Sequence, residues 1–216
     1  MERIDDLQYQ ELRIIQDDEL PCFTEDAVLL ANFLRAGPQD VVVDLGAGSG
    51  VISILGQRKT GARFVGVEQQ PQLAALARRS AAMNGQAIPF YEMNVRDAPR
   101  ALGHGAFTVA VSNPPYFSAE RTPTAAESRS FSRHGDARSL DSFIAAAFLL
   151  LKNGGRFFAC WPISGLTDML CVLRGHRLEP KRVQIVCQRG TPRLALIEAK
   201  KLAGHGMAVT LFNPST

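Results

Sequence analysis

The fold of this chain is indicated most clearly by the stretch Val41-Val42-Val43-Asp44-Leu45-Gly46-Ala47-Gly48-Ser49-Gly50. Three consecutive valines are typical of a strand that is buried on both faces of a parallel sheet. The glycine-rich turn after them leads into a helix predicted at 50–58. Further strands are predicted at 63–68, 88–95, 107–112 and 156–160, alternating with helices at 71–83 and 140–151. This alternation predicts an α/β fold, a parallel sheet covered by helices on both faces.

The remaining elements are expected near the two ends of the chain. Before the first buried strand we expect a strand-like segment at 11–16 and a helix at 25–34, with Thr24 as its N-cap. After residue 160 we expect a helix at 164–174 and strands at 182–187 and 193–199, around a turn at Gly190-Thr191-Pro192. Asn153-Gly154-Gly155 is predicted to end the helix at 140–151. A polar stretch at 118–138 is predicted to be a long loop.

The length and composition of the chain restrict its class. With 216 residues, 46% of them hydrophobic, the chain can bury a full core. We expect a single domain over 1–216, in which 1–39 form an N-terminal extension and 40–216 the core. No segment approaches the about 18 consecutive apolar residues of a membrane span, and the acidic N-terminus is unlike a secretory signal. These features predict a cytoplasmic protein that does not act on membranes.

The cysteines and histidines show no metal-binding pattern. Cys22, Cys160, Cys171 and Cys187 lie far apart and form no Cys-x-x-Cys pair. The four histidines likewise lack ligand spacing. We therefore predict reduced cysteines that serve packing, with no disulfide and no metal site.

The glycine-rich turn belongs to a class of loops that bind phosphate, a dinucleotide or the methionine part of S-adenosylmethionine. The dinucleotide fingerprint Gly-x-Gly-x-x-Gly is absent, because the glycines are Gly46, Gly48 and Gly50. The Walker pattern is absent too, since no Lys-Ser or Lys-Thr comes directly after Gly50. Without side chains at Gly46 and Gly48, the backbone can approach an amino-acid group closely. Asp44 can hold the ammonium of such a group or the amides of the loop itself. A plain tight turn is the alternative.

Two polar residues follow the next strands of the predicted sheet. Glu68 ends the second strand, where a carboxylate can accept hydrogen bonds from both hydroxyls of a ribose. Asn94 lies at the end of the third strand, where it can bind an adenine amino group or serve as a simple turn residue. The combination with the glycine loop favours an adenosine-containing cofactor over a plain turn.

The segment Asn113-Pro114-Pro115-Tyr116 follows another apolar strand. The side-chain carbonyl of Asn113 and the backbone carbonyl of Pro114 can accept hydrogen bonds from a planar amino group, which localises its lone pair for attack. Tyr116, or Phe117 beside it, can stack on a base. A Pro-Pro turn without function is the alternative, but its place after the fourth strand, downstream of the glycine loop, favours a reaction at an amino group.

Several quoted segments together resemble a known family. The segments are FTEDAVLLANFL (23–34), DLGAGSG (44–50), SNPPYF (112–117), Arg133-His134 and LLLKNGGRF (149–157). They resemble the bacterial tRNA1(Val) adenine-37 N6-methyltransferases, of the Asn-Pro-Pro-Tyr class of S-adenosylmethionine-dependent enzymes, over roughly residues 7–210. The resemblance implies a Rossmann-like class I methyltransferase fold with a seven-stranded, mainly parallel sheet whose last strand is antiparallel.

The resemblance also implies roles for individual residues. The segment 23–26, which contains Thr24, is expected to close over S-adenosylmethionine. Cofactor contacts are expected at Thr24, Asp44, Gly46, Gly48, Gly50, Glu68 and Asn94, catalysis at Asn113, Pro114, Pro115 and Tyr116, and substrate contacts at Phe117, Arg133 and His134. The family more often has an acidic residue where this chain has Asn94.

The charge distribution bears on the substrate. Residues 152–201 hold ten basic and three acidic side chains, although the net charge of the chain is only +3. This half, with Lys181 and Arg182, is a candidate surface for tRNA phosphates. Alternatively, its charges have partners within the molecule, in the N-terminal segment 1–26 with its nine acidic residues.

Three alternatives to adenine methylation in tRNA remain open. The same four residues also serve enzymes that methylate a glutamine amide in translation release factors, or guanine N2 in ribosomal RNA. A module that binds the cofactor or RNA without turnover is the third alternative. The short segment before residue 40 favours the compact tRNA-type enzyme.

Overall fold

The computed structural model describes residues 1–114 and 133–214, and for 133–139 it describes the backbone alone. Its elements are β1 (Glu2–Asp6), β2 (Arg13–Asp17), α1 (Glu25–Phe33), β3 (Val41–Leu45), α2 (Val51–Thr60), β4 (Arg63–Glu68), α3 (Pro71–Met83), β5 (Phe90–Glu92), α4 (Ala98–Leu102), β6 (Phe107–Ser112), α5 (Arg133–Leu150), β7 (Leu151–Pro162), the 3₁₀ helix η1 (Ile163–Gly165), α6 (Leu166–Gly175), β8 (Leu178–Gln188), β9 (Thr191–Lys201) and β10 (Ala208–Phe212).

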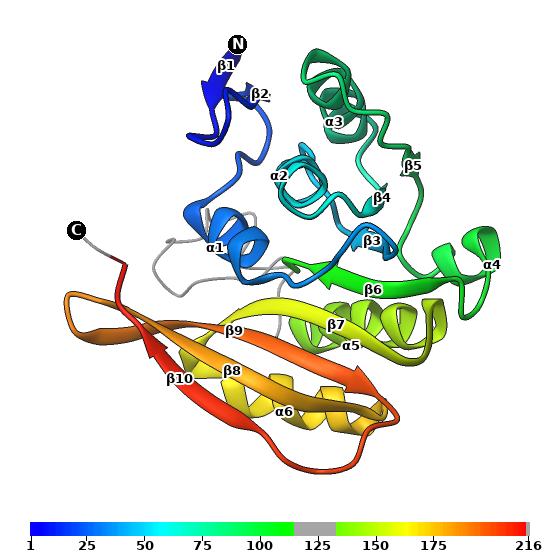
Figure 1. The fold of residues 1–216 in the computed structure, drawn as a ribbon, viewed down its shortest axis with the longest axis vertical. Coiled ribbons are helices and arrows are strands. Elements are labelled where there is room, and N and C mark those ends of the chain that lie inside the picture. The colour runs from blue at the N-terminus through cyan, green and yellow to red at the C-terminus, as the bar shows by residue number, and fades with distance from the viewer. Residues whose placement is uncertain (115–132, 215–216) are drawn as a thin grey trace.

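A mixed sheet runs through the molecule in the strand order β10-β8-β9-β7-β6-β3-β4-β5 (Figure 1). From β7 to β5 all neighbours are parallel, whereas β9 is antiparallel to both β7 and β8. These seven strands confirm the predicted mainly parallel sheet with an antiparallel last strand. The difference is β10, which adds an eighth strand parallel to β8 at the edge.

Helices cover both faces of this sheet. In Figure 1, α1, α2 and α3 lie on one face, and α5 and α6 lie on the other. Neighbouring residues of one strand therefore enter two different cores: Phe158 packs with the α1–α3 side and Phe157 with the α5–α6 side. Val42 and Val43 divide in the same way. Because both faces are buried, these strands need continuous apolar sequences, which is the pattern that predicted them.

A two-stranded hairpin, β1 with β2, precedes the main sheet (Figure 1), and its strand β2 contacts α3. The Ile15 amide donates to Ser80 Oγ at 3.0 Å, and the Arg79 guanidinium binds both Glu2 carboxylate oxygens at 2.7 and 2.8 Å. The sequence predicted only the second strand of this hairpin, because the polar, acidic segment 2–6 has no buried face of its own.

Several boundaries differ from the predictions for local reasons. Helix α5 begins at Arg133, so the last part of the predicted loop at 118–138 is helical, and it ends at Leu150. β7 starts directly at Leu151 and includes Asn153-Gly154-Gly155. The β8–β9 turn falls on Arg189 and Gly190, both with positive φ, one residue before the predicted position. Among the described residues, no helix is long and apolar enough to cross a membrane.

Candidate active site

The glycine-rich loop lies between the end of β3 and the start of α2, and the backbone of β4 anchors it. The amides of Gly46 and Ala47 donate to the Val67 carbonyl at 2.9 and 3.0 Å. Gly46 has φ +74°, and a Cβ there would lie 2.9 Å from the Phe143 ring. Gly48 also has positive φ, but none of the described residues beyond its chain neighbours lies within 4 Å of its Cβ position. The protein therefore fills the space beside Gly46 and leaves space for a ligand beside Gly48.

Glu68 connects this loop to the start of α3. Its Oε2 accepts a hydrogen bond from the Gly48 amide and its Oε1 one from the Gln70 amide, each at 2.9 Å. The residue is only 5% exposed. Each carboxylate oxygen retains acceptor capacity, so the predicted contact with two hydroxyls is compatible with this geometry. The loop contact itself was not predicted.

Asp44 is a fully buried carboxyl group at the end of β3. Ser53 Oγ, in α2, donates to its Oδ2 at 2.8 Å. Its Oδ1 is buried and has no hydrogen-bond partner within the described part of the chain. Burial, followed by the nearby charge of Glu68, raises the pKa of Asp44 to about 7. A buried acceptor without a donor is costly, and a cationic group is the partner that offsets this cost best.

Asn94 follows β5 and is exposed. Its Oδ1 accepts from the Arg96 amide at 3.0 Å, and its Nδ2 donates to Gln69 Oε1 at 3.1 Å. Both ends of the amide thus have partners, which matches the alternative of a turn asparagine. The predicted adenine contact stays a prediction.

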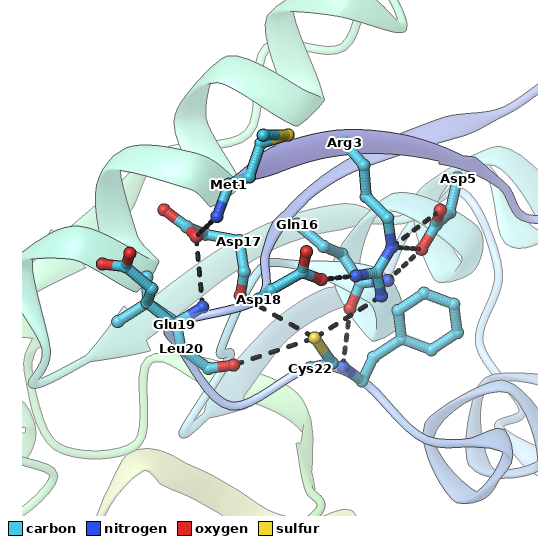
Figure 2. Close-up of polar contacts among 10 residues, drawn as sticks. Met1, Arg3, Asp5, Gln16, Asp17, Asp18, Glu19, Leu20 and Cys22 are labelled. Atoms are coloured by element: carbon cyan, nitrogen blue, oxygen red, sulfur yellow. Dashed lines mark hydrogen bonds and ion pairs between the residues drawn. The ribbon is translucent and has the colours of Figure 1, made fainter.

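The segment ahead of α1 is held by the N-terminal hairpin (Figure 2). Thr24 occupies the N-cap position, but its hydroxyl makes no capping hydrogen bond, so the predicted cap is wrong in this respect. Instead the Phe23 amide donates to Gln16 Oε1 at 2.9 Å, while Gln16 Nε2 binds Asp5. Gln16 is nearly buried. Sequence reasoning missed it, because a glutamine in a short strand carries no functional signal.

Asn113 follows β6, which lies directly beside β3. Val111 pairs with Asp44, and Ser112 Oγ donates to the Leu45 carbonyl at 2.7 Å, so the ends of the two strands are aligned. Asn113 is half-buried, Pro114 is buried, and Cys160 Sγ donates to Asn113 Oδ1 at 3.0 Å. Pro115, Tyr116 and Phe117 lie outside the described residues. Arg133 and His134 begin α5, and their side chains are also outside the description.

Lys181 and Arg182 lie on β8, which β9 and β7 separate from β6. Lys181 Nζ donates to the carbonyls of Gly204 and His205 at 3.2 and 3.3 Å. Arg182 binds Glu198 at 2.9 Å and lies over the Phe33 ring. The structure does not bring these two cations together with Asn113, and their predicted RNA contact stays a prediction.

The other basic residues of 152–201 also divide by position. Arg189, in the β8–β9 turn, and Arg193, next to the pair Pro162–Leu194, lie at the end of the sheet where β7 finishes. Arg193 binds Asp26 at 2.8 Å, which supports the alternative of partners in the acidic N-terminal segment. The opposite end of these strands holds Lys152, Arg156, Arg174, Arg177, Lys200 and Lys201. The described basic residues of 152–201 are therefore divided between two ends of the sheet, and the predicted surface for tRNA phosphates stays a prediction.

The four cysteines are free; Cys160 and Cys187 are buried, whereas Cys22 and Cys171 are exposed and do not serve packing. The described residues contain no group of three or more His, Cys, Asp or Glu that could hold a metal ion.

Known proteins are similar to this chain in sequence. A tRNA1(Val) (adenine(37)-N6)-methyltransferase of Porphyromonas gingivalis is 30% identical over 168 residues, which are 73% of this chain and 65% of the relative. A release factor glutamine methyltransferase of Geobacter sulfurreducens is 38% identical over 91 residues, 41% of this chain and 31% of the relative. The chain thus spans about two thirds of the first relative and about a third of the second.

A solved structure and a family model agree with these relatives. The crystal structure of a predicted O-methyltransferase from Agrobacterium tumefaciens matches with a TM-score of 0.68 at 19% identity, covering 88% of this chain and 86% of that one. This likeness shows the Rossmann-like methyltransferase fold. The family model described as methyltransferase small domain matches residues 25–161, more than half of the chain. The chain therefore belongs to the methyltransferase small domain family.

Proposed function

We propose that this protein methylates an exocyclic amino group with S-adenosylmethionine as the methyl donor, and that the amino group is N6 of an adenine in the anticodon loop of a tRNA. The observation that carries the proposal is the alignment of the β3 and β6 ends, which sets Asn113 beside the glycine loop. A site for the donor and an acceptor for the target amine thus lie at one edge of the sheet.

The residues of the loop fit S-adenosylmethionine. The open space at the Cβ position of Gly48 lets a ligand approach the backbone. The unpartnered Oδ1 of Asp44 offers a buried acceptor for a cation, and the cofactor carries an ammonium and a sulfonium group. Glu68 holds the Gly48 amide in place and offers further lone pairs to ribose hydroxyls. Asp44, Gly48 and Glu68 are the residues that would hold the cofactor.

Asn113 and Pro114 are proposed to prepare the target nitrogen. The lone pair of an exocyclic amine is delocalised into the ring and attacks poorly. When Asn113 Oδ1 and the Pro114 carbonyl accept its two N–H groups, the nitrogen becomes more tetrahedral and its lone pair is localised. The bound S-adenosylmethionine supplies a methyl group on a positively charged sulfur. The contribution of the protein is orientation and electrostatics, which need no strong base.

The similarity to relatives favours tRNA over a protein substrate. The match to the tRNA methyltransferase extends over 73% of this chain, whereas the match to the release factor enzyme extends over 41%, and that to a putative protein N5-glutamine methyltransferase of Methanocaldococcus jannaschii, at 32% identity, over 61%. Arg189, exposed in the β8–β9 turn, is a cation available to a phosphate at this end of the sheet. A tRNA substrate would place the enzyme in the cytoplasm.

A transfer assay with three acceptors tests the substrate. The protein is incubated with tritiated S-adenosylmethionine and bulk tRNA, ribosomal RNA or a translation release factor, each purified from a strain that lacks the modification. Nucleoside mass analysis of the tRNA should show N6-methyladenosine and no other new product. Transfer to a release-factor glutamine, or to guanine in ribosomal RNA, would contradict the proposed substrate and leave the amino-group chemistry intact.

A further inference from the structure

A buried thiol contacts the side chain of Asn113. Cys160 lies on β7, where the preceding residue Ala159 pairs with Ser112 of β6. Cys160 and Asn113, each one residue further along, therefore lie side by side. Cys160 has no exposed surface, and its Sγ lies 3.0 Å from Asn113 Oδ1. The contact joins residues that are 47 positions apart in the sequence. It involves the same oxygen that the proposed reaction uses as an acceptor.

The thiol is a hydrogen-bond donor in this environment. Burial, and next the negative charge of Asp26, raise the pKa of the Cys160 thiol well above its ordinary value. The Asp26 carboxylate is itself held by Arg193 at 2.8 Å. At neutral pH the sulfur therefore carries its proton and can donate it. The acceptor is the oxygen end of the Asn113 amide, whose Oδ1 lies 3.0 Å from the sulfur.

We propose that Cys160 is a positioning residue that fixes the orientation of the Asn113 amide for the incoming amino group. A carbonyl oxygen accepts two hydrogen bonds, so one lone pair of Oδ1 binds the thiol while the other remains for an N–H of the target. Without the thiol, the amide can rotate about its last torsion, and either end can face the substrate. This inference rests on the proposed function of Asn113.

Four variants separate positioning from packing. Cys160→Ala removes the donor, and Cys160→Ser keeps a donor in a slightly smaller side chain. Cys187→Ala is the matched control, because Cys187 is also buried in the sheet but lies on β8 and packs with the opposite core. Asn113→Ala identifies the side-chain amide signals of Asn113 in a nitrogen–proton spectrum by their loss.

The first readout is single-turnover methyl transfer to the acceptor that the wild-type protein methylates, with cofactor affinity measured in parallel. We expect Cys160→Ala to slow transfer about 2- to 10-fold, the equivalent of one neutral hydrogen bond. Cys160→Ser should restore most of this loss, and Cys187→Ala should transfer at the wild-type rate. Cofactor affinity should not change in any of the three. Equal rates in wild type and Cys160→Ala, or equal losses in Cys160→Ala and Cys160→Ser, would overturn the proposal.

The second readout needs no substrate and so distinguishes a failure of this inference from a failure of the proposed function. The side-chain amide resonances of Asn113 should shift and broaden in Cys160→Ala and stay in place in Cys187→Ala. If the wild-type protein methylates none of the acceptors, the proposed function fails, and this spectrum alone decides the contact. Unchanged Asn113 resonances in Cys160→Ala would overturn the positioning role.

Discussion

At the residue scale, Asp44 makes the stability of the protein depend on pH. Its pKa of about 7 in the folded state lies above the value of about 3.9 for an unfolded chain. Between these values the folded state binds more protons, so the free energy of unfolding falls as the pH rises from about 4 to 7. Urea unfolding should give a lower free energy of unfolding at pH 7.5 than at pH 4.5. Asp44→Asn should reduce this difference by about 2–4 kcal/mol.

Asp168→Asn is the control for this measurement, because Asp168 is an exposed carboxylate in the first turn of α6. It should leave the difference between the two pH values unchanged. If the free energy of unfolding differed between the two pH values by the same amount in Asp44→Asn and in the wild type, Asp44 would be ionised in the folded protein throughout this range.

Glu68 holds two backbone amides, so its removal should affect both the fold and the cofactor site. Glu68→Ala should lower the free energy of unfolding, because the amides of Gly48 and Gln70 lose their acceptor. It should also weaken S-adenosylmethionine binding by about 1.5–3 kcal/mol, measured by calorimetry. Glu92→Ala is the matched control, since Glu92 pairs with Glu68 at the end of the next strand and is exposed. A cofactor dissociation constant within twofold of the wild type would remove Glu68 from the site.

The sequence predicted the places of the candidate site residues in the fold better than it predicted their hydrogen-bond partners. Asp44, Glu68 and Asn113 are found at strand ends on one edge of the sheet, because parallel strands end together. The contacts of Glu68 with Gly48 and of Cys160 with Asn113 join distant positions. The first contact depends on the register of β4 on β3 and the second on the register of β7 on β6, which no local pattern reports.

At the element scale, Lys201 of β9 caps the end of α5. Its Nζ donates to the carbonyls of Phe148 and Leu151, both at 2.7 Å, and lies over the Phe148 ring. Carbonyls at a helix end lack partners within the helix, and a cation there also complements the helix dipole. Lys201→Met should therefore lower the free energy of unfolding by about 1.5–3 kcal/mol. Lys200→Met, the exposed neighbour, should change it by less than about 0.5 kcal/mol; similar losses in both would contradict the cap.

The end of α5 lies one residue before the predicted end, but the signal that was expected to end the helix is wrong. Asn153-Gly154-Gly155 is a usual helix-ending sequence, yet α5 already ends at Leu150, where a lysine from β9 supplies the cap. β10 was missed for a related reason. Its five residues are all exposed, and only the edge of β8 holds them in an extended conformation. Tertiary contacts decided both boundaries.

At the scale of the whole molecule, the basic residues of the C-terminal half are spread over both ends of the sheet. If tRNA binds at the end that carries Asn113, its affinity should fall with salt with a log–log slope of about 3 to 5 in magnitude. Arg189→Ala should reduce that slope by about one, because Arg189 lies in the β8–β9 turn at this end. Lys200→Ala, at the far end of β9, is the matched control and should leave it unchanged. Equal effects of the two variants would place the RNA elsewhere.

The most direct test of the site as a whole is single-turnover methyl transfer to tRNA by Asn113→Ala, with calorimetric binding of S-adenosylmethionine to the same preparation. In the proposed mechanism Asn113 supplies an acceptor for the target amine, whereas the glycine loop and Glu68 hold the cofactor. We expect Asn113→Ala to leave the cofactor dissociation constant unchanged and to lower the transfer rate by about 10²- to 10³-fold. Wild-type transfer by Asn113→Ala would contradict this expectation.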